Sequence, residues 1–73
     1  MKTVFDYNIT EEENKHIGLL DKDFYLNHCT EDDANMDLAL LFYLRNEKEK
    51  AREYADKLPI DMKNDFWRTV THP

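Results

Sequence analysis

Residues 36–44 carry a single polar side chain, Asp37, among eight apolar ones. With Thr30 as the expected cap, residues 31–45 form one helix that is apolar nearly all round. Such a helix must be covered on several sides by the rest of the chain. The chain has 73 residues, one glycine and two prolines, so few reversals are available and other helices must supply the cover. We predict one all-α domain over residues 1–73, a small bundle of four to five short helices.

Two further helices are expected before residue 31. Thr10 followed by Glu13 matches a capping box, in which the hydroxyl and the carboxylate each bind a backbone amide of the other residue. The helix that begins there has Ile17 and Leu20 as its apolar stripe. A second short helix is expected over residues 21–28. The sequence thus changes at residue 10 to a helical region that extends to residue 71.

The C-terminal half predicts a hairpin and a last helix. Residues 47–58 place apolar side chains at helical spacing, and Asn46 is suited to the left-handed conformation that ends a helix. Residues 31–58 therefore form a central helical hairpin, and Asp61 caps the final helix. The predicted core consists of Leu38, Leu41, Phe42, Ala51, Tyr54, Phe66 and Trp67.

The first nine residues show a different period. Phe5, Tyr7 and Ile9 alternate with polar residues, which is typical of a half-buried extended strand. The chain has no second alternating run to pair with it. The extended arm 1–9 either lies across the helices or pairs with the same strand of a second copy or with a partner's sheet edge. We favour the second outcome, and with it a homodimer.

The stretch from Leu38 to Ala55 contains Leu38, Ala39, Phe42 and Ala51 at a spacing found in helical repeats. On these residues, region 36–58 resembles one helix pair of the tetratricopeptide type. The resemblance implies a helical hairpin and a role in protein interaction. It implies no particular ligand-binding residue.

Negative charge is concentrated in the first half of the chain. Residues 1–37 hold ten acids and three bases, a net charge of −7, whereas residues 38–73 hold six acids and seven bases, a net charge of +1. Two interpretations stay open: helix capping with solubility, or a docking surface for a basic protein partner. The residues of the candidate docking surface are Glu11, Glu12, Glu13, Glu31, Asp32, Asp33 and Asp37.

Patterns that would indicate catalysis or a metal site are incomplete. Residues 21–32 resemble a calcium loop only superficially, because Leu26 stands at the position of the turn glycine. Cys29 and the histidines His28, His16 and His72 lack the paired spacing of a zinc site. Adjacent residues of a helix point about 100° apart, so His28 and Cys29 do not form a catalytic pair. We expect no cofactor, no metal and no enzymatic activity.

The remaining signals concern location and function. The single cysteine cannot form an intrachain disulfide, the N-terminus lacks the apolar region of a signal peptide, and the longest apolar run is far below the ~20 residues that span a bilayer. We expect a cytoplasmic protein without membrane association. The leading hypothesis is a small acidic protein–protein interaction module. The alternatives are an acidic nucleic-acid mimic or antitoxin-like inhibitor and a helix-turn-helix DNA-binding protein, although nucleic acid is an improbable partner for a chain of net charge −6.

Overall fold

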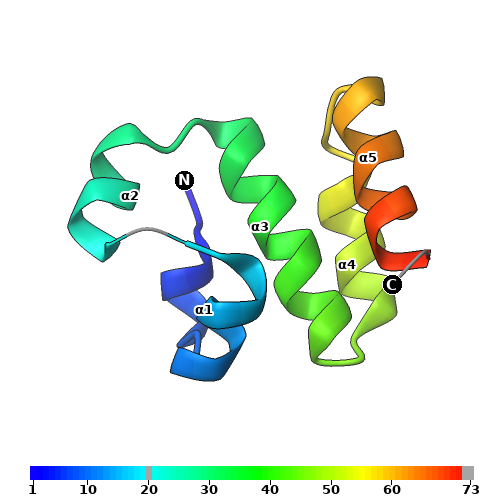
Figure 1. Ribbon diagram of the computed structural model, residues 1–73. Coiled ribbons are helices and arrows are strands. Elements are labelled where there is room, and N and C mark those ends of the chain that lie inside the picture. Colours follow the sequence, from blue (N-terminus) through cyan, green and yellow to red (C-terminus); the bar gives the residue numbers. More distant parts are fainter. Residues whose placement is uncertain (20, 72–73) are drawn as a thin grey trace.

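Helices make up the fold in the computed structural model, which describes residues 1–19 and 21–71 (Figure 1). They are the 3-10 helix η1 (Val4–Tyr7) and the α-helices α1 (Glu11–Ile17), α2 (Lys22–His28), α3 (Glu31–Leu44), α4 (Lys48–Ala55) and α5 (Ile60–Thr71). No strand occurs within this range, so the all-α prediction is confirmed. Leu20, expected on the stripe of the first helix, and His72 lie outside the described residues.

α3 is the central element of the bundle. In Figure 1, α1 and α2 lie on one side of it, and α4 and α5 lie on the other. Its Leu38, Leu41 and Phe42 side chains are fully buried. The neighbouring elements contribute further buried side chains to the same core, namely Val4, Ala51, Ala55, Leu58 and Phe66. The nearly uniform apolar sequence of residues 36–44 thus has the organising role that was predicted.

The predicted hairpin is formed by α3 and α4. Asn46 has the expected positive φ of 62°, and Glu47 N–H donates to the carbonyl of Phe42 at 2.8 Å, which closes the turn. Ala39 and Ala51 are both fully buried. Their small side chains let the two helices approach closely. α4 ends at Ala55, three residues earlier than expected.

The early end of α4 has a local cause. Lys57 and Leu58 donate to carbonyls three residues back, at 3.2 and 3.0 Å, so the chain tightens into a turn before Pro59. α5 then begins at Ile60, and Asp61 lies in its first turn rather than at the cap position. The prediction that Asp61 caps this helix is therefore wrong, because Asp61 is the second residue of α5, although its position in the first turn still suits the positive end of the helix dipole.

Most of the predicted core is confirmed. Of its seven members, Tyr54 and Trp67 are only half-buried, and the others are buried.

The predicted capping box of the first helix is also present. Glu13 N–H donates to the Thr10 hydroxyl at 3.1 Å, and the Glu13 carboxylate accepts from Thr10 N–H at 2.9 Å. α1 then ends at Gly18, whose φ of 78° is strained for any residue with a side chain.

The prediction of an extended N-terminal arm is wrong, because Val4–Tyr7 form the 3-10 helix η1. A second capping box starts this helix: Phe5 N–H donates to the Thr3 hydroxyl at 3.3 Å, and Thr3 N–H donates to the Asp6 carboxylate at 2.8 Å. Asn8 ends it in the left-handed conformation. These local bonds outweigh the alternating pattern, so the segment presents no strand edge for a second copy or a partner.

α2 is attached to the bundle mainly through Tyr25, its one buried residue. The ring of Tyr25 meets the edge of Phe5 at 5.4 Å between centroids. Phe24 and Leu26 on the same helix are exposed. In the part of the chain that the structure describes, each helix is too short or too polar to cross a membrane.

Candidate functional site

One side of α3 is left without full cover. Met36, Leu40 and Leu44 recur at i, i+4 and i+8, on the side of the helix opposite the buried Leu38 and Phe42. Met36 and Leu40 are half-buried, and Leu44 is 47% exposed. We call these three residues the open face of α3. The expectation of cover on several sides is thus met by the helices that flank α3, but not on this side of it.

A hollow of about 470 Å³ lies along the open face, between α1, α3 and α5. Its surface is largely aliphatic and aromatic, and its lining contains no aspartate, glutamate, lysine or arginine among the described residues. We call it the apolar hollow, and its lining residues are His16, Ile17, Leu40, Tyr43, Leu44, Thr69 and Val70. Concave apolar surface beside an exposed leucine is typical of sites that bind another protein.

The apolar hollow continues into a polar one of about 350 Å³. The two share His16 and Leu44, and the second adds Glu12, Glu13 and Arg45. Glu12 is exposed and has no neutralising partner among the described residues, whereas Glu13 is paired with Arg45. This end of the open face therefore carries one uncompensated negative charge.

Arg45 fastens the N-terminal segment to the end of α3. Its Nε donates to Glu13 Oε2 at 2.7 Å, and its Nη2 donates to Glu13 Oε1 at 3.0 Å and to the carbonyl of Tyr7 at 2.9 Å. The Arg45 hydrogen bond lowers the pKa of Glu13 to about 2, and the same contact raises the pKa of Arg45. Glu13 thus serves the fold, and its charge is compensated inside the chain.

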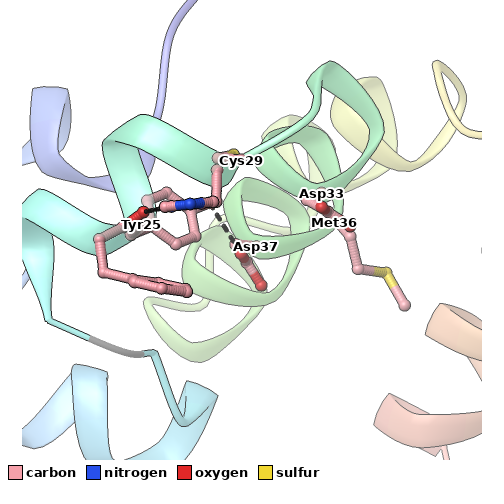
Figure 2. Close-up of a pocket in the computed structure, with 7 residues that line it drawn as sticks. Tyr25, Cys29, Asp33, Met36 and Asp37 are labelled. Atoms are coloured by element: carbon pink, nitrogen blue, oxygen red, sulfur yellow. Dashed lines mark hydrogen bonds between the residues drawn. The ribbon is translucent and has the colours of Figure 1, made fainter.

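The opposite end of the open face borders a pocket of about 270 Å³ between α2 and α3, shown in Figure 2. The Tyr25 hydroxyl donates to Asp37 Oδ2 at 2.7 Å across this pocket. Burial raises the pKa of both groups, although the hydrogen bond from Tyr25 opposes the shift for Asp37. Asp33 and Met36 line the same pocket, and in Figure 2 Met36 points away from Asp37.

His28 and Cys29 also line this pocket but are engaged with the backbone. His28 Nδ1 lies 3.0 Å from the carbonyl oxygen of Phe24, and its ring stacks on the Phe24 ring at 4.1 Å between centroids. Cys29 Sγ donates to the carbonyl of Thr30 at 3.1 Å. No group of three side chains suited to holding a metal ion occurs within residues 1–19 and 21–71. The pocket offers a hydrogen-bonded tyrosine and carboxylate rather than an assembled nucleophile and base.

The seven acidic candidate residues do not form one patch. Glu13 meets Arg45 at the C-terminal end of α3, whereas the cluster 31–33 begins that helix. The 14 residues of α3 separate the two ends by roughly 20 Å, at a rise of about 1.5 Å per residue. Asp33 accepts from Thr30 N–H in a capping box, and Asp37 accepts from Tyr25. The acids therefore lie in two groups, one near each end of the open face.

Phe5, Tyr7 and Ile9, the candidate pairing residues, pack against the core instead. The Tyr7 and Tyr54 hydroxyls are hydrogen-bonded at 2.9 Å, and the Tyr7 ring meets the edge of Phe42 at 4.9 Å between centroids. Because these side chains are turned inward, they contribute to the fold and not to an exposed strand.

Comparison of the chain with family models, with curated proteins and with solved structures finds no match. Function must therefore be argued from the geometry. Leu40, Leu44, Ile17 and Val70 line the apolar hollow but are not among the candidate site residues predicted from the sequence. The sequence does contain an indication of an uncovered surface. Residues 36–44 have apolar side chains on every side, and a chain of this size has too few apolar helices to cover them all round.

Proposed function

We propose that this chain is a small protein-interaction module without catalytic activity, and that it docks its partner on the open face of α3. The observation that carries the proposal is the apolar hollow of about 470 Å³ beside Leu44, which is 47% exposed. Covering that surface removes apolar area from water, a gain of about 25 cal/mol for each Å² buried, from which the entropy costs of association and ordering are subtracted. The proposal includes a cytoplasmic location, and the resemblance of region 36–58 to a tetratricopeptide-type helix pair implies the same kind of role.

A nucleic-acid mimic would need a continuous array of free carboxylates. Here Glu13 is bonded to Arg45, Asp33 takes part in a helix cap, and Asp37 accepts from Tyr25. The acids are also divided between the two ends of α3. The geometry therefore supports an interaction module more strongly than mimicry.

DNA binding by the hairpin would need a free basic face on α4. The ammonium groups of Lys48, Lys50 and Lys57 lie over the rings of Tyr43, Phe42 and Tyr54, at 5.7, 5.2 and 4.9 Å from the centroids. Acidic residues alternate with these lysines along the helix. The lysines are thus placed to cover aromatic rings, which favours a structural role for them.

Site-specific photo-crosslinking in the native host tests the proposal. A benzoylphenylalanine at His16, on the rim of the apolar hollow, should give one defined adduct with a partner protein. The same group at Ile60, which is 66% exposed at the start of α5, is the control and should not give that adduct. Adding Leu40→Glu to the His16 variant should remove the adduct. Equal labelling from both positions, or an adduct that survives Leu40→Glu, would contradict docking at the open face.

A further inference from the structure

The shape of the open face favours a helical occupant. Met36 and Leu44 are eight residues apart on α3, which corresponds to about 12 Å at 1.5 Å per residue. α1 and α5 flank the Leu40–Leu44 end of this line, where α3 forms the floor of the apolar hollow, and Met36 at the other end lines the pocket beside α2. An apolar line of two helical turns that is hollowed at one end suits an amphipathic helix that inserts side chains at i, i+3 or i+4, and i+7.

The charges around the open face favour a basic occupant. Glu12 lies beside one end, and Asp33 and Asp37 lie beside the other. Among the described residues that line these three hollows, the only lysine or arginine is Arg45, which is bonded to Glu13. An approaching helix therefore meets an apolar centre with carboxylates near both ends and with no free lysine or arginine among these described lining residues.

The same charges disfavour a second copy of this chain. A symmetric dimer through the open face would bring Glu12, Asp33 and Asp37 of each copy toward the same set on the other. Each chain carries a net charge of −6, which adds repulsion over the whole surface. η1 also offers no strand edge that would compensate by backbone pairing.

We propose that the open face of α3 binds a basic amphipathic helix of a partner protein, with the apolar side of that helix in the apolar hollow. Lysine or arginine side chains at its two ends face Glu12 and the Asp33–Asp37 pair. This inference rests on the proposed function and specifies the partner's chemistry.

Titration of the ¹⁵N-labelled full chain with two synthetic peptides tests the inference. One is a 14-residue amphipathic helix of leucine and lysine, and the other has glutamate in place of each lysine. The lysine peptide should shift the amide signals of Leu40, Leu44 and Val70 and bind at least about tenfold more tightly than the glutamate peptide. Raising the salt from about 0.05 M to 0.5 M should weaken its binding several-fold.

Leu44→Glu separates docking in the hollow from unspecific attraction between opposite charges. This change makes the chain more acidic, so unspecific attraction would strengthen, whereas docking at the open face should weaken at least about tenfold. Ile60→Glu adds the same charge elsewhere and is the matched control. Leu44→Ala should also weaken peptide binding, without adding a charge. A well-dispersed amide spectrum verifies that each variant is folded.

Glu12→Gln and Glu11→Gln form a second matched pair on one turn of α1. Glu12 lines the polar hollow and Glu11 does not, so the first change should weaken binding of the lysine peptide about threefold and the second should have a smaller effect.

Equal affinity for the two peptides, or unchanged binding by Leu44→Glu, would overturn the proposal. Concentration-dependent shifts of Leu40 and Leu44 without peptide would assign the face to a second copy instead. A defined adduct from His16 together with failure of the lysine peptide would retain the interaction module and reject the basic helix.

Discussion

The two halves of the molecule are held to α3 by different forces. α4 and α5 contribute Ala51, Ala55 and Phe66 to the buried core, whereas among the described residues η1, α1 and α2 contribute two buried apolar side chains, Val4 and Tyr25, and otherwise pack with half-buried ones. The N-terminal half depends in addition on hydrogen bonds, from Arg45 to Glu13, between Tyr7 and Tyr54, and from Tyr25 to Asp37. Apolar packing depends little on pH, whereas contacts that include a carboxylate do. The C-terminal half should therefore form the stable unit, and the N-terminal half should open locally and respond to pH.

Phe66→Ala should have the largest effect, because it removes a fully buried ring from the apolar half. Loss of the transfer free energy together with the cavity left behind should lower the free energy of unfolding by about 3–5 kcal/mol. Helical circular dichroism during urea denaturation measures the change. Phe24→Ala, at an exposed position of α2, is the control. A Phe66→Ala protein as stable as this control would disprove the assignment of the core to α3, α4 and α5.

Glu13→Gln should have the next largest effect and should act locally. Glutamine preserves the capping interaction of α1 but removes the charge that Arg45 binds with two hydrogen bonds. The side chains of this pair are only 18% and 25% exposed, so the loss should be about 1–2 kcal/mol for opening of α1. Amide hydrogen exchange should show faster exchange in α1 and unchanged exchange in α3.

Asp65→Asn is the matched control for Glu13→Gln. It removes the acid of the Arg68–Asp65 pair, whose side chains are mostly exposed, and should change stability by less than about 0.5 kcal/mol. If both variants behaved alike, the Arg45 contact would be an ordinary surface ion pair. The lower local stability expected for the N-terminal half would then not depend on this contact.

Acid should act on the two polar attachments in opposite directions. The pKa of Glu13 is lowered from 4.5 to about 2, so its contribution is present above pH 4.5 and is lost as the pH falls toward 2. The pKa of Asp37 is raised above 3.8, so protonation favours the folded state and the α2 attachment persists on acidification. Amide protection factors, which correct for the slower intrinsic exchange in acid, should therefore fall in α1 before α2 between pH 6 and pH 3. Glu13→Gln should abolish this early loss of protection in α1.

The central helix and most helix ends could be predicted because their signals are local. Residues 36–44 specify α3 by their composition, Thr10 marks a helix start by capping, and Asn46 marks a helix end by its positive φ. The end of α1 at Gly18 was not predicted, because the apolar stripe was expected to continue to Leu20. η1 was missed because two local patterns compete over the same residues. The alternating apolar residues indicate a strand, but Thr3 and Asp6 form a capping box of the same kind that was recognised at Thr10.

The candidate site was less predictable because it depends on how the helices are placed around α3. Sequence periodicity shows that α3 is apolar nearly all round, but not which side stays uncovered. The contact between Arg45 and Glu13 joins residues 32 positions apart, and no local pattern marks it. That contact positions α1, which in turn forms one wall of the apolar hollow through Ile17. The acidic candidates could be listed from the sequence, but their separation into two groups could not.

Tyr25→Phe should have the smallest effect and should be confined to α2. The ring keeps its contact with Phe5, and only the hydroxyl that donates to Asp37 is lost. The free energy of opening α2 should fall by about 1 kcal/mol or less, visible as faster amide exchange in α2 alone. Tyr43→Phe, which removes the hydroxyl of a half-buried tyrosine outside α2, is the control.

The pKa of Asp37 gives a second and more specific measurement of the same change. In the native protein, burial raises this pKa and the hydrogen bond from Tyr25 lowers it. Tyr25→Phe removes only the lowering contribution, so the pKa of Asp37 should rise further, and carbon-detected NMR titration of the carboxylate would show it. An unchanged pKa would mean that the hydroxyl does not bind Asp37 in solution. α2 would then be attached by apolar contact alone, and the polar attachment of the N-terminal half would be limited to η1 and α1.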